Sequence, residues 1–326
     1  MKAIRVAQYG DPSVMKLEEL PKPAPGAGEA LVRVHAVGVN YADIYMRNGA
    51  ARMPTPLPYT LGIEGAGTVE AVGAGVSDVR PGDRVAYATT GMGSYAEYHV
   101  VKVGHLAPLP KEVSFEDGAA VILQGLTAHY LLHEFYPIKR GSTVLVHAAA
   151  GGMGLILVQW LKHMGAVAIG TVSTEEKAQI AREAGAEHVI NYTKDDFAEE
   201  AKKVTGGKGV DYVIDGVGKT TFAKNFDALR QRGWATIFGM ASGPADAVVP
   251  NSLMGKSLTI SGGALFNYMN TREEVIGRAN DVFKGMREGW LTLRVDRSLS
   301  LSQAAEAHRR LEGRQTVGKL ILKTGN

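Results

Sequence analysis

The sequence predicts an α/β protein in which an all-β part is followed by a doubly wound parallel sheet. Residues 2–39 and 61–101 form short segments of alternating apolar and polar residues, separated by turns rich in glycine and proline. Residues 143–265 instead alternate between strand-like and helix-like segments, which is typical of a parallel sheet with helices on both faces. The chain has 326 residues, and single hydrophobic cores stop growing at roughly 250–300 residues. We therefore expect two domains.

The N-terminal part is expected to contain strands and one polar helix. Residues 3–8 and 30–37 alternate as strands do, and residues 21–28 between them are rich in proline and glycine. In residues 38–49 apolar and polar side chains recur at helical spacing, and Gly49 is suited to end the helix. This helix carries more polar residues than a simple connector needs, which makes it a candidate for function.

The later part is expected to supply the parallel sheet and a C-terminal tail. Its expected strands are short and mostly apolar, and they span residues 143–148, 166–172, 188–192, 210–215, 234–240 and 257–262. In the tail we expect a long amphipathic helix from about residue 271 to 288, a polar helix at 302–311 and a last strand at 319–322. We expect this tail to pack back on the N-terminal domain.

A glycine-rich turn at residues 148–154 is the strongest local signal. An apolar run from Val144 breaks into small residues and glycines before the apolar pattern resumes, which predicts a strand, a tight turn and a helix. Gly151, Gly152 and Gly154 let the backbone come close to a bulky anion, and the first amides of the helix point at it. The spacing predicts a dinucleotide pyrophosphate site, with Ala148 in place of the first glycine of the usual fingerprint. A buried glycine-rich turn without a ligand remains the alternative.

Composition excludes several function classes. The net charge of +3 comes from 36 basic and 33 acidic residues without a long run of either sign, which argues against a nucleic-acid groove. The absence of cysteine excludes disulfides, thiol nucleophiles and cysteine-bound zinc. The N-terminal residues lack the apolar core of a signal peptide, so we expect a cytoplasmic protein. Residues 141–161 are uncharged and long enough to span a bilayer, but their glycines and His147 favour a buried strand-turn-helix unit and no membrane contact.

Further motifs occur along nearly the whole chain and together resemble one protein family. In chain order they are Asn40-x-x-Asp43 with Arg47-x-Gly49, Gly62-x-Glu64, Gly82-Asp-Arg-Val85, Gln124-Gly-Leu-Thr127, His147-Ala-Ala-Ala-Gly-Gly-Met-Gly154 with Gln159 and Lys162, Phe238-Gly-Met-Ala-Ser-Gly243 and Leu265-Phe-Asn-Tyr268. This set resembles the medium-chain dehydrogenase/reductase superfamily and, within it, the zinc-independent quinone oxidoreductases that include zeta-crystallin.

The resemblance implies a specific division of the chain. Residues 1–124 and 268–326 would form a GroES-like β-barrel catalytic domain, and residues 125–267 would form a Rossmann NADPH-binding domain. An active-site cleft would lie between the two. The family also implies a homodimer, and the strand-like residues 257–265, at the edge of the sheet, are where we expect its seam.

Catalytic zinc is not expected. The zinc alcohol dehydrogenases of the superfamily carry a Gly-His-Glu motif, whereas this chain has Gly62-Ile63-Glu64 and no cysteine to supply thiolates. Without a Lewis acid, simple alcohols become poor substrates, while hydride delivery to a quinone or an enone needs no metal. The alternative for Glu64 is a hydrogen-bonded structural carboxylate. A tyrosine that commonly follows the Arg-x-Gly turn is missing here, because the chain continues Gly49-Ala-Ala-Arg52.

NADPH is expected rather than NADH. An NAD site usually places Asp or Glu at the end of the second strand, but no acid follows Ile169-Gly-Thr-Val-Ser173 at that point. Ser173, Lys177 and Tyr192 would accept a 2′-phosphate there, as the family pattern implies. The alternative is that residues 173–176 form only a helix capping box and that Lys177 is a solvated charge. The nearby Glu175 and Glu176 argue mildly against a phosphate.

The remaining site residues are implied by the resemblance. The cofactor contacts that we expect are Asn40, Thr127, Ala150, Gly151, Gly152, Met153, Gly154, Ser173, Lys177, Tyr192, Val217, Phe238, Gly239, Ser242, Leu265, Phe266 and Lys319. The candidates for catalysis are Asn40, Asp43, Tyr45, Arg47 and Tyr59, because a phenol or another polar group can hydrogen-bond the acceptor oxygen as charge develops. Core packing by the aromatic residues and a helix-turn hydrogen bond by Asp43 are the structural alternatives.

Three functions remain in competition after these observations. The first is NADPH-dependent quinone reduction, with a small quinone as the partner. The second is NADPH-dependent reduction of the double bond of an alkenal or enone, which uses the same hydride geometry. The third belongs to another class and is a zeta-crystallin-like binding role, for example to RNA, or a structural role. The glycine turn favours a working cofactor site, and the small net charge disfavours RNA.

Overall fold

The computed structural model describes residues 1–50 and 55–325, so Arg52 of the turn after Gly49 lies outside the described residues. Contacts between residues divide the chain into two compact units. The first unit comprises residues 1–126, 266–287 and 293–326, and the second comprises residues 127–265 and 288–292. The first unit is therefore assembled from three separate stretches of the sequence.

The first unit is built on two sheets. Its strands are β1 (Lys2–Val6), β2 (Met15–Glu19), β3 (Glu29–Val39), β4 (Tyr59–Thr60), β5 (Glu64–Val72), β6 (Arg84–Ala88), β7 (Tyr98–Lys102), β8 (Leu106–Pro108), β15 (Val295–Ser300) and β16 (Lys319–Lys323). A three-stranded sheet has the order β2-β1-β4, and a seven-stranded sheet has the order β15-β16-β3-β5-β6-β8, with β7 also pairing with β3. This is the GroES-like half of the expected α/β fold.

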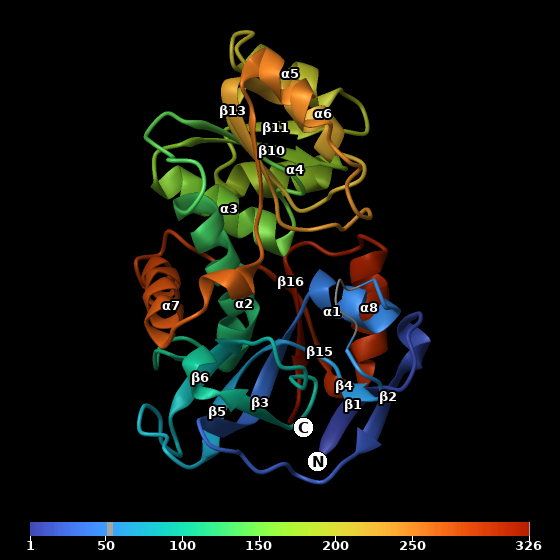
Figure 1. Ribbon diagram of the computed structural model, residues 1–326, viewed down its shortest axis with the longest axis vertical. Coiled ribbons are helices and arrows are strands. Elements are labelled where there is room, and N and C mark those ends of the chain that lie inside the picture. The colour runs from blue at the N-terminus through green and yellow to red at the C-terminus, as the bar shows by residue number, and fades with distance from the viewer. Residues whose placement is uncertain (51–54, 326) are drawn as a thin grey trace. The chain divides into compact units, whose positions relative to one another are not determined.

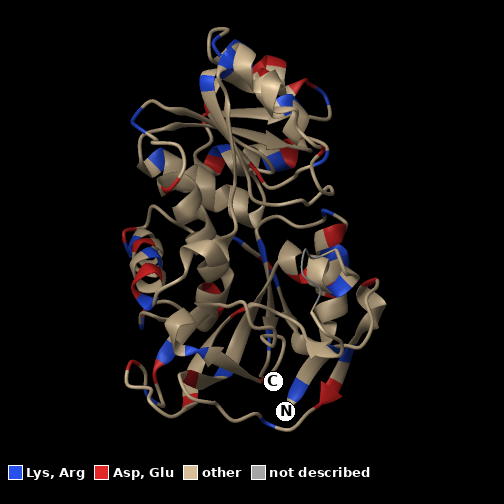
Figure 2. Ribbon diagram, viewed as in Figure 1, with Lys and Arg blue, Asp and Glu red and all other residues tan. Residues whose placement is uncertain are grey.

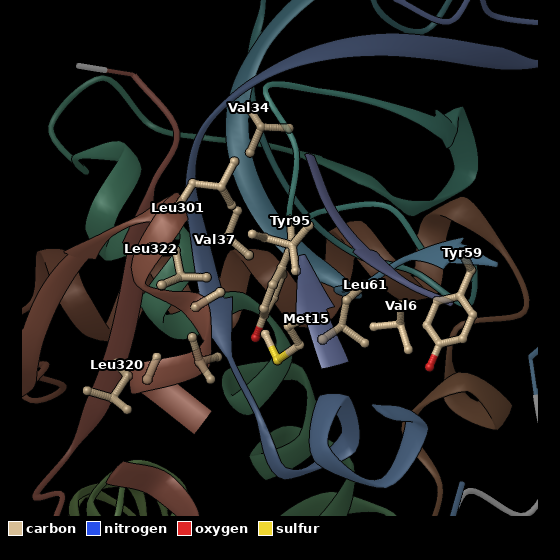
Figure 3. Packing of buried hydrophobic residues seen from close by; sticks show 14 residues of the cluster. Val6, Met15, Val34, Val37, Tyr59, Leu61, Tyr95, Leu301, Leu320 and Leu322 are labelled. Carbon is tan, nitrogen blue, oxygen red and sulfur yellow. The ribbon is translucent and has the colours of Figure 1, made fainter. Parts of the chain in front are cut away.

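The C-terminal strand completes the larger sheet. In Figure 1 the red strand β16 runs beside the blue strand β3, and the two pair antiparallel with Leu320 opposite Val39 and Leu322 opposite Val37. Apolar side chains of these strands pack with Leu61 and with the ring of Tyr95 in one core (Figure 3). The expected packing of the tail on the N-terminal domain is thus confirmed. Burial of such a core is the main favourable term in the folding of this unit.

The described residues of this unit also form four α-helices and several 3₁₀ turns. The helices are α1 (Tyr41–Asn48), α2 (Phe115–His133), α7 (Arg272–Arg287) and α8 (Ala304–Glu312), and α2 continues from the first unit into the second. The helix α1 begins with a capping box between Asn40 and Asp43 and ends at Gly49, whose φ of 79° suits glycine. The polar tail helix α8 follows a 3₁₀ turn, Leu301–Gln303. The strand β15 was not expected, because its residues are largely exposed and lack a clear apolar alternation.

The second unit is the predicted doubly wound sheet. Its six strands are parallel, in the order β11-β10-β9-β12-β13-β14. They are β9 (Thr143–Val146), β10 (Val167–Val172), β11 (His188–Asn191), β12 (Val210–Asp215), β13 (Leu229–Ile237) and β14 (Thr259–Gly262). The helices between them are α3 (Gly152–His163), α4 (Glu175–Ala184), α5 (Phe197–Val204) and α6 (Phe222–Ala228). The order reverses next to β9, where such sheets bind ligands.

Charge is spread over the surface. Figure 2 shows both signs along α7, whose first turn carries Glu273 and Glu274 and whose last turn carries Lys284 and Arg287. Acidic residues at the start and basic residues at the end of a helix both stabilise its dipole. Within the described part of the chain, no helix combines the length and apolarity needed to cross a bilayer. The uncharged residues 141–161 are divided between β9 and α3.

Candidate active-site residues

The glycine turn joins β9 to α3 by a close approach of backbone to backbone. A Cβ atom on Gly154 would lie 2.3 Å from the carbonyl oxygen of Ala148 and 2.6 Å from the Cα of Ala149. Only glycine fits there without a shift of main-chain atoms. At Gly151 the same test gives 3.2 Å to the oxygen of Ala148, and the amide of Gly151 donates a hydrogen bond of 2.9 Å to that oxygen.

Alanine occupies a glycine-like conformation at the start of this turn. Ala148 has φ of 53°, in the left-handed region that an L-residue enters at a cost of roughly 1–2 kcal/mol. The sequence departs from the usual fingerprint at this position, whereas the backbone does not. The turn therefore keeps the geometry that a glycine would have given it.

The helix α3 presents unsatisfied amides at the end of the turn. Its first intrahelical acceptor is the carbonyl of Gly151, which receives the amide of Leu155 at 2.9 Å. The amides of Gly152, Met153 and Gly154 precede that bond and have no carbonyl within the helix to donate to. Together with the positive end of the helix dipole, these amides form a site that suits an anionic group. Ala150, in the same turn, is buried.

The end of β10 carries the residues expected to contact a 2′-phosphate. Thr174, and not Ser173, is the N-cap of α4, since its hydroxyl accepts the amide of Lys177. Ser173 thus lies outside the cap. Glu175 forms an ion pair of 2.8 Å with Arg182, so part of its charge is compensated. Tyr192 is exposed directly after β11, and its amide is bonded to the end of β10.

The ends of β12 and β13 are held by a buried carboxylate. Asp215 Oδ1 accepts the amides of Val217 and Gly218 at 2.7 and 3.0 Å, and its Oδ2 accepts from Thr221 and Asn225. The hydroxyl of Ser242 then donates 2.8 Å to the carbonyl of Val217. These bonds fix the loop after β12 and tie to it the loop after β13, so that the expected cofactor contacts Val217 and Ser242 are both held.

A buried histidine extends this network to β9. His147 is within hydrogen-bond distance of Thr171 through Nδ1 (2.9 Å) and of Asn225 through Nε2 (2.7 Å). Burial lowers the pKa of His147, so the ring is neutral and serves to orient its neighbours. The aromatic residue Phe238 closes this side, because a Cβ on Gly216 would lie 2.7 Å from its ring.

Three expected contacts lie at the borders of the second unit. Thr127 is buried in the middle of α2, at the first residue of the second unit. Leu265 and Phe266 belong to one 3₁₀ turn, Leu265–Tyr268, in which Leu265 is buried and Phe266 is partly exposed. Gly239 lies beside Gly216, whose carbonyl oxygen would be 2.7 Å from a Cβ at Gly239.

In the first unit Asn40, Glu64 and Lys319 form a buried ionic group. The ammonium of Lys319 donates to Glu64 Oε2 at 2.7 Å and to Asn40 Oδ1 at 2.6 Å. The side-chain amide of Asn40 donates to the same Glu64 oxygen at 2.7 Å, and Glu64 Oε1 accepts the backbone amide of Leu123 at 2.7 Å. Glu64 is completely buried, so its charge is compensated entirely by these donors. In this structure Glu64 is a hydrogen-bonded structural carboxylate, which was the alternative considered from the sequence.

Asp43 is buried next to this group. Its Oδ2 accepts the backbone amide of Asn40 at 2.9 Å and the hydroxyl of Tyr95 at 3.1 Å. Burial raises the pKa of Asp43 to about 7, although these two hydrogen bonds and the charge of Lys319 oppose the increase. Asp43 is therefore a carboxyl group that titrates near neutral pH.

The other catalytic candidates differ in how much of their polar surface is occupied. Arg47 is buried and forms hydrogen bonds of 2.6 and 3.1 Å to the two carboxylate oxygens of Glu312. The hydroxyl of Tyr59 donates 2.9 Å to the carbonyl of Met46, and burial raises the pKa of Tyr59 to about 12. Tyr45 is partly exposed on α1.

Two polar residues of this region were not predicted. Tyr95 and His308 are fully buried and lie between Asp43 and Arg47, with Tyr95 Oη 3.1 Å from His308 Nε2. His308 lies in an amphipathic helix among alanines and arginines, and nothing in that pattern distinguishes it from a surface histidine. Only the pairing of strands and helices from distant parts of the chain brings it to α1.

Comparisons with known proteins agree with this architecture. Residues 26–111 match the alcohol dehydrogenase GroES-like domain family, and residues 152–281 match the zinc-binding dehydrogenase family. The chain is 42% identical to a 2-haloacrylate reductase of a Burkholderia species, over 97% of each chain. It is 41% identical to a quinone oxidoreductase of Pseudomonas aeruginosa, over 98% of this chain and 99% of that one.

A solved structure extends the likeness to the fold. The quinone oxidoreductase of Escherichia coli, complexed with NADPH, superposes with a TM-score of 0.97 at 40% identity and covers 99% of this chain and 100% of that chain. The two matched families define the class of medium-chain dehydrogenases and reductases. Within that superfamily, the chain belongs to the zinc-independent quinone oxidoreductases.

The zinc ligands of the wider superfamily are missing from this sequence. Ile63 replaces the histidine of the Gly-His-Glu motif, and the chain has no cysteine. Across residues 1–50 and 55–325, no group of three or more histidine, aspartate or glutamate side chains is arranged to hold a metal ion. The carboxylate of Glu64 binds the Lys319 ammonium instead.

Proposed function

We infer that the protein is an NADPH-dependent quinone oxidoreductase. The inference rests chiefly on one observation: the chain matches a quinone oxidoreductase complexed with NADPH over its full length. The glycine turn, which is too close-packed for a Cβ at Gly154, and the free amides of α3 fit a dinucleotide. NADPH would supply the hydride, and the quinone would become a hydroquinone after taking up a proton.

The residues of the second unit would bind and orient the cofactor. We propose that the amides of residues 152–154 hold the pyrophosphate, and that Ser173, Lys177 and Tyr192 hold the 2′-phosphate. The further contacts that we propose in this unit are Thr127, Ala150, Gly151, Val217, Phe238, Gly239, Ser242 and Leu265. The bonds of Asp215 and Ser242 support this proposal, because they hold the two loops that contain Val217 and Ser242.

The residues of the first unit would orient the nicotinamide and the acceptor. We propose Asn40, Phe266 and Lys319 as cofactor contacts and Asp43 and Tyr45 as groups that assist reduction. The dense hydrogen bonding of Asn40 and Lys319 supports a fixed orientation of both side chains. Arg47 and Tyr59 keep the predicted catalytic role as a proposal, although their hydrogen bonds to Glu312 and Met46 favour an indirect effect.

Cofactor preference gives a direct test. Replacing Ser173 by Asp and Lys177 by Ala should weaken NADPH binding and leave NADH binding nearly unchanged. Loss of one charged contact to the 2′-phosphate costs about 1.5–3 kcal/mol, or roughly 10- to 150-fold in affinity. Both affinities are measurable by fluorescence titration. Equal losses for the two cofactors would contradict the proposed phosphate site.

A second candidate is reduction of an activated carbon–carbon double bond. The 42% identity to a 2-haloacrylate reductase favours it specifically, and the chemistry again requires a hydride and a proton but no metal. Steady-state rates with 1,4-benzoquinone, 9,10-phenanthrenequinone and 2-hexenal separate the two candidates. The quinone proposal expects the larger kcat/KM for a quinone, and a larger value for the alkenal would replace it.

Independence from metal follows from the missing ligands. We expect dialysis against a strong chelator to leave quinone reduction unchanged, because the sequence offers neither a thiolate nor the motif histidine. A rate that collapses and returns on addition of zinc would overturn this expectation.

We propose that the protein forms a homodimer through residues 257–265. The strand β14 is the edge of the six-stranded sheet, and the amide of Gly263 donates to Ile237 of β13. Because amides alternate along a strand, those of Ile260 and Gly262 point away from β13 and could pair with a second copy. Val249 and Met254 nearby are 69% and 73% exposed, as expected for an apolar surface that a partner covers.

Proline substitution tests this seam. Ile260→Pro removes an outward amide and should give a monomer in sedimentation without breaking the bonds to β13. Thr259→Pro is the matched control, because the amide of Thr259 faces β13, and it should lower stability. A monomeric wild type, or an Ile260→Pro variant that stays dimeric, would exclude β14 as the seam.

We propose the cytoplasm as the location, where a reductase would draw on NADPH, with only small molecules and a second copy as partners. The dispersed charge of both signs supports the absence of a nucleic-acid partner. Cell fractionation tests the location, and recovery of the protein outside the cytoplasmic fraction would contradict it.

A further inference from the structure

A continuous chain of buried hydrogen bonds leads from an ion pair near the surface to Asp43. Glu312 is about one-third exposed and binds Arg47. Arg47 Nη1 is 2.9 Å from His308 Nδ1, His308 Nε2 is 3.1 Å from the hydroxyl of Tyr95, and that hydroxyl is 3.1 Å from Asp43 Oδ2. Arg47, His308, Tyr95 and Asp43 are all at most 1% exposed. The ring of Tyr95 is part of the apolar core in Figure 3.

The guanidinium of Arg47 determines the direction of every bond in this chain. An arginine has only hydrogen-bond donors, so His308 Nδ1 must accept the hydrogen bond from Arg47. Burial, and secondly the charge of Arg47, lower the pKa of His308 to about 3, so the ring is neutral and carries its one hydrogen on Nε2. That nitrogen therefore donates to Tyr95, and the single hydroxyl hydrogen of Tyr95 is left to donate to Asp43. From Arg47 onward, each bond is donated toward the carboxyl group of Asp43.

This direction restricts where Asp43 can hold a proton. A proton on Oδ2 would face the hydroxyl hydrogen of Tyr95 and the amide of Asn40, because both already donate to that oxygen. Reversing the Tyr95 hydroxyl would in turn require His308 Nε2 to accept, which Arg47 forbids. Among the described residues, Asp43 Oδ1 has no hydrogen-bond partner, so a proton there would be buried without an acceptor. The chain therefore excludes a proton on Oδ2, and a proton on Oδ1 gains no hydrogen bond.

The other charged groups around Asp43 act in opposite directions. The Lys319 ammonium on β16 favours the carboxylate, whereas the Glu64 carboxylate on β5 disfavours it. Tyr59 lies near enough for Asp43 to contribute to its raised pKa. Burial raises the pKa of Asp43 above its ordinary value. The hydrogen bonds that Asn40 and Tyr95 donate lower this pKa and so oppose the effect of burial.

We propose that Tyr95 and His308 are positioning residues: they carry the donor direction imposed by Arg47 to Asp43 and thereby help to hold Asp43 ionised as the cap that fixes Asn40. This role rests on the proposed function, in which Asn40 contacts the cofactor. The carboxylate of Asp43 accepts the backbone amide of Asn40 in the capping box of α1. The Asn40 side chain is in turn bonded to Glu64 and Lys319. A weaker cap would thus loosen one end of the group proposed to orient the nicotinamide.

The titration of Asp43 tests the chain without any cofactor. Infrared difference spectra of the protein between pH 5 and pH 9 would contain a carboxyl band that is missing in Asp43→Asn. Tyr95→Phe removes one donor, and we expect the midpoint of that band to rise by about one pH unit. His308→Leu should raise it in the same direction, because Tyr95 is then free to rotate.

A conservative variant separates relay from packing. In His308→Gln the side-chain amide can still accept from Arg47 and donate to Tyr95, so the midpoint should stay within about 0.3 pH units of wild type. His308→Leu and His308→Gln should both lower the melting temperature, because both disturb a buried site. A role in packing alone predicts equal midpoints in all of these variants, and that result would overturn the proposal.

The pH profile of NADPH binding supplies the functional measurement. As pH falls through the midpoint of Asp43, the dissociation constant of NADPH should rise, and in Tyr95→Phe this rise should begin about one pH unit higher. A profile that does not follow the infrared midpoint would overturn the positioning role. Failure of the wild type to bind NADPH at any pH would instead refute the proposed function, and the infrared titration would still report on the chain.

Discussion

The two units assemble their proposed sites from different materials. In the second unit the site consists mainly of backbone: a turn with Gly154 packed against Ala148, amides at the start of α3, and a loop held by Asp215. In the first unit the site consists of side chains, with Glu64 and Lys319 paired at 2.7 Å in a fully buried setting. The site in the second unit depends on the missing Cβ atom of a glycine, and the site in the first unit depends on the charges of Glu64 and Lys319.

This difference determines how each unit should respond to change. A backbone site is sensitive to added volume, because a new Cβ must displace main-chain atoms, but it contains little that titrates at neutral pH. A buried ionic site tolerates little loss of charge, because removal of one partner leaves the other uncompensated. The three tryptophans, Trp160, Trp234 and Trp290, all lie in the second unit. Tryptophan fluorescence therefore reports on that unit alone, and circular dichroism reports on both.

The largest effect is expected for Lys319→Met. The substitution leaves Glu64 buried without its cation, which typically costs about 3–5 kcal/mol. Urea unfolding followed by circular dichroism should show a transition at lower denaturant, while the tryptophan transition stays in place. The double variant Lys319→Met with Glu64→Gln is the control and should recover part of the loss. A double variant no more stable than the single one would show that the lost ammonium, and not the orphaned carboxylate, dominates.

The next effect concerns acid. Burial lowers the pKa of His99, which contacts Ser94 and Tyr87, to about 4 from an ordinary 6.5. Between these values the unfolded chain binds a proton that the folded chain does not, so stability falls as pH falls from 6.5 to 4, by roughly 3 kcal/mol. The lowered pKa of His308 likewise makes the protein less stable as pH falls. Asp43, with a raised pKa, acts oppositely, because the stability due to its proton is present below pH 4 and is lost as pH rises through about 7.

Substitution isolates the contribution of one histidine. His99→Gln should flatten the loss of stability between pH 6.5 and 4, measured as the free energy of unfolding at several pH values. His188→Gln, at a partly exposed position in the second unit, is the matched control and should leave the slope unchanged. An unchanged slope in His99→Gln would mean that His99 does not titrate in the folded protein as burial predicts.

A smaller effect is expected at the glycine turn. Gly154→Ala places a methyl group 2.3 Å from the Ala148 oxygen, and such overpacking costs about 1–3 kcal/mol. We expect the tryptophan transition to shift and NADPH binding to weaken, with the first unit little affected. Gly151→Ala, where the nearest atom is at 3.2 Å, should cost less than Gly154→Ala. Equal costs would show that close packing is not what requires glycine at residue 154.

The smallest effect is expected for Ala148→Gly. Glycine relieves the left-handed conformation at φ of 53°, but its greater freedom in the unfolded chain offsets part of the gain. The net change should be a stabilisation of at most about 1 kcal/mol, visible in the tryptophan transition. Ala149→Gly, at a buried position that packs on Gly170, should instead destabilise. A destabilised Ala148→Gly would indicate that the methyl group makes a contact that outweighs the strain.

The glycine turn and the alternation of the later strands were enough to predict the second unit, because both signals are local. The strand β13 shows the limit of such signals: it begins at Leu229, five residues before the expected start, and includes Arg232 at positive φ. The polar run Arg230-Gln-Arg232 gave no strand signal in the first half of β13. Leu229 and the residues from Trp234 onward pair with β12, with a register shift between them, so the strand begins through a tertiary contact that local propensity does not predict.

In the first unit the sequence predicted Asn40 and Asp43 but not the partners that define their chemistry. Tyr95 and His308 reach Asp43 across 52 and 265 positions of sequence, with the second contact made through Tyr95. A hydrogen bond of this kind leaves no periodic trace, whereas a helix or a strand does. The roles of the proposed site residues therefore remain predictions until they are tested.

The position of β16 has a consequence for biosynthesis. Residues 127–265 are contiguous, so most of the second unit can form as soon as it leaves the ribosome. The seven-stranded sheet must wait, because β16 lies between β15 and β3 and is made after the whole second unit. Until then Glu64 has no ammonium to neutralise it, and the apolar edge of β3 is uncovered. We therefore expect the chain to depend most on chaperones during the time before β16 has been synthesised.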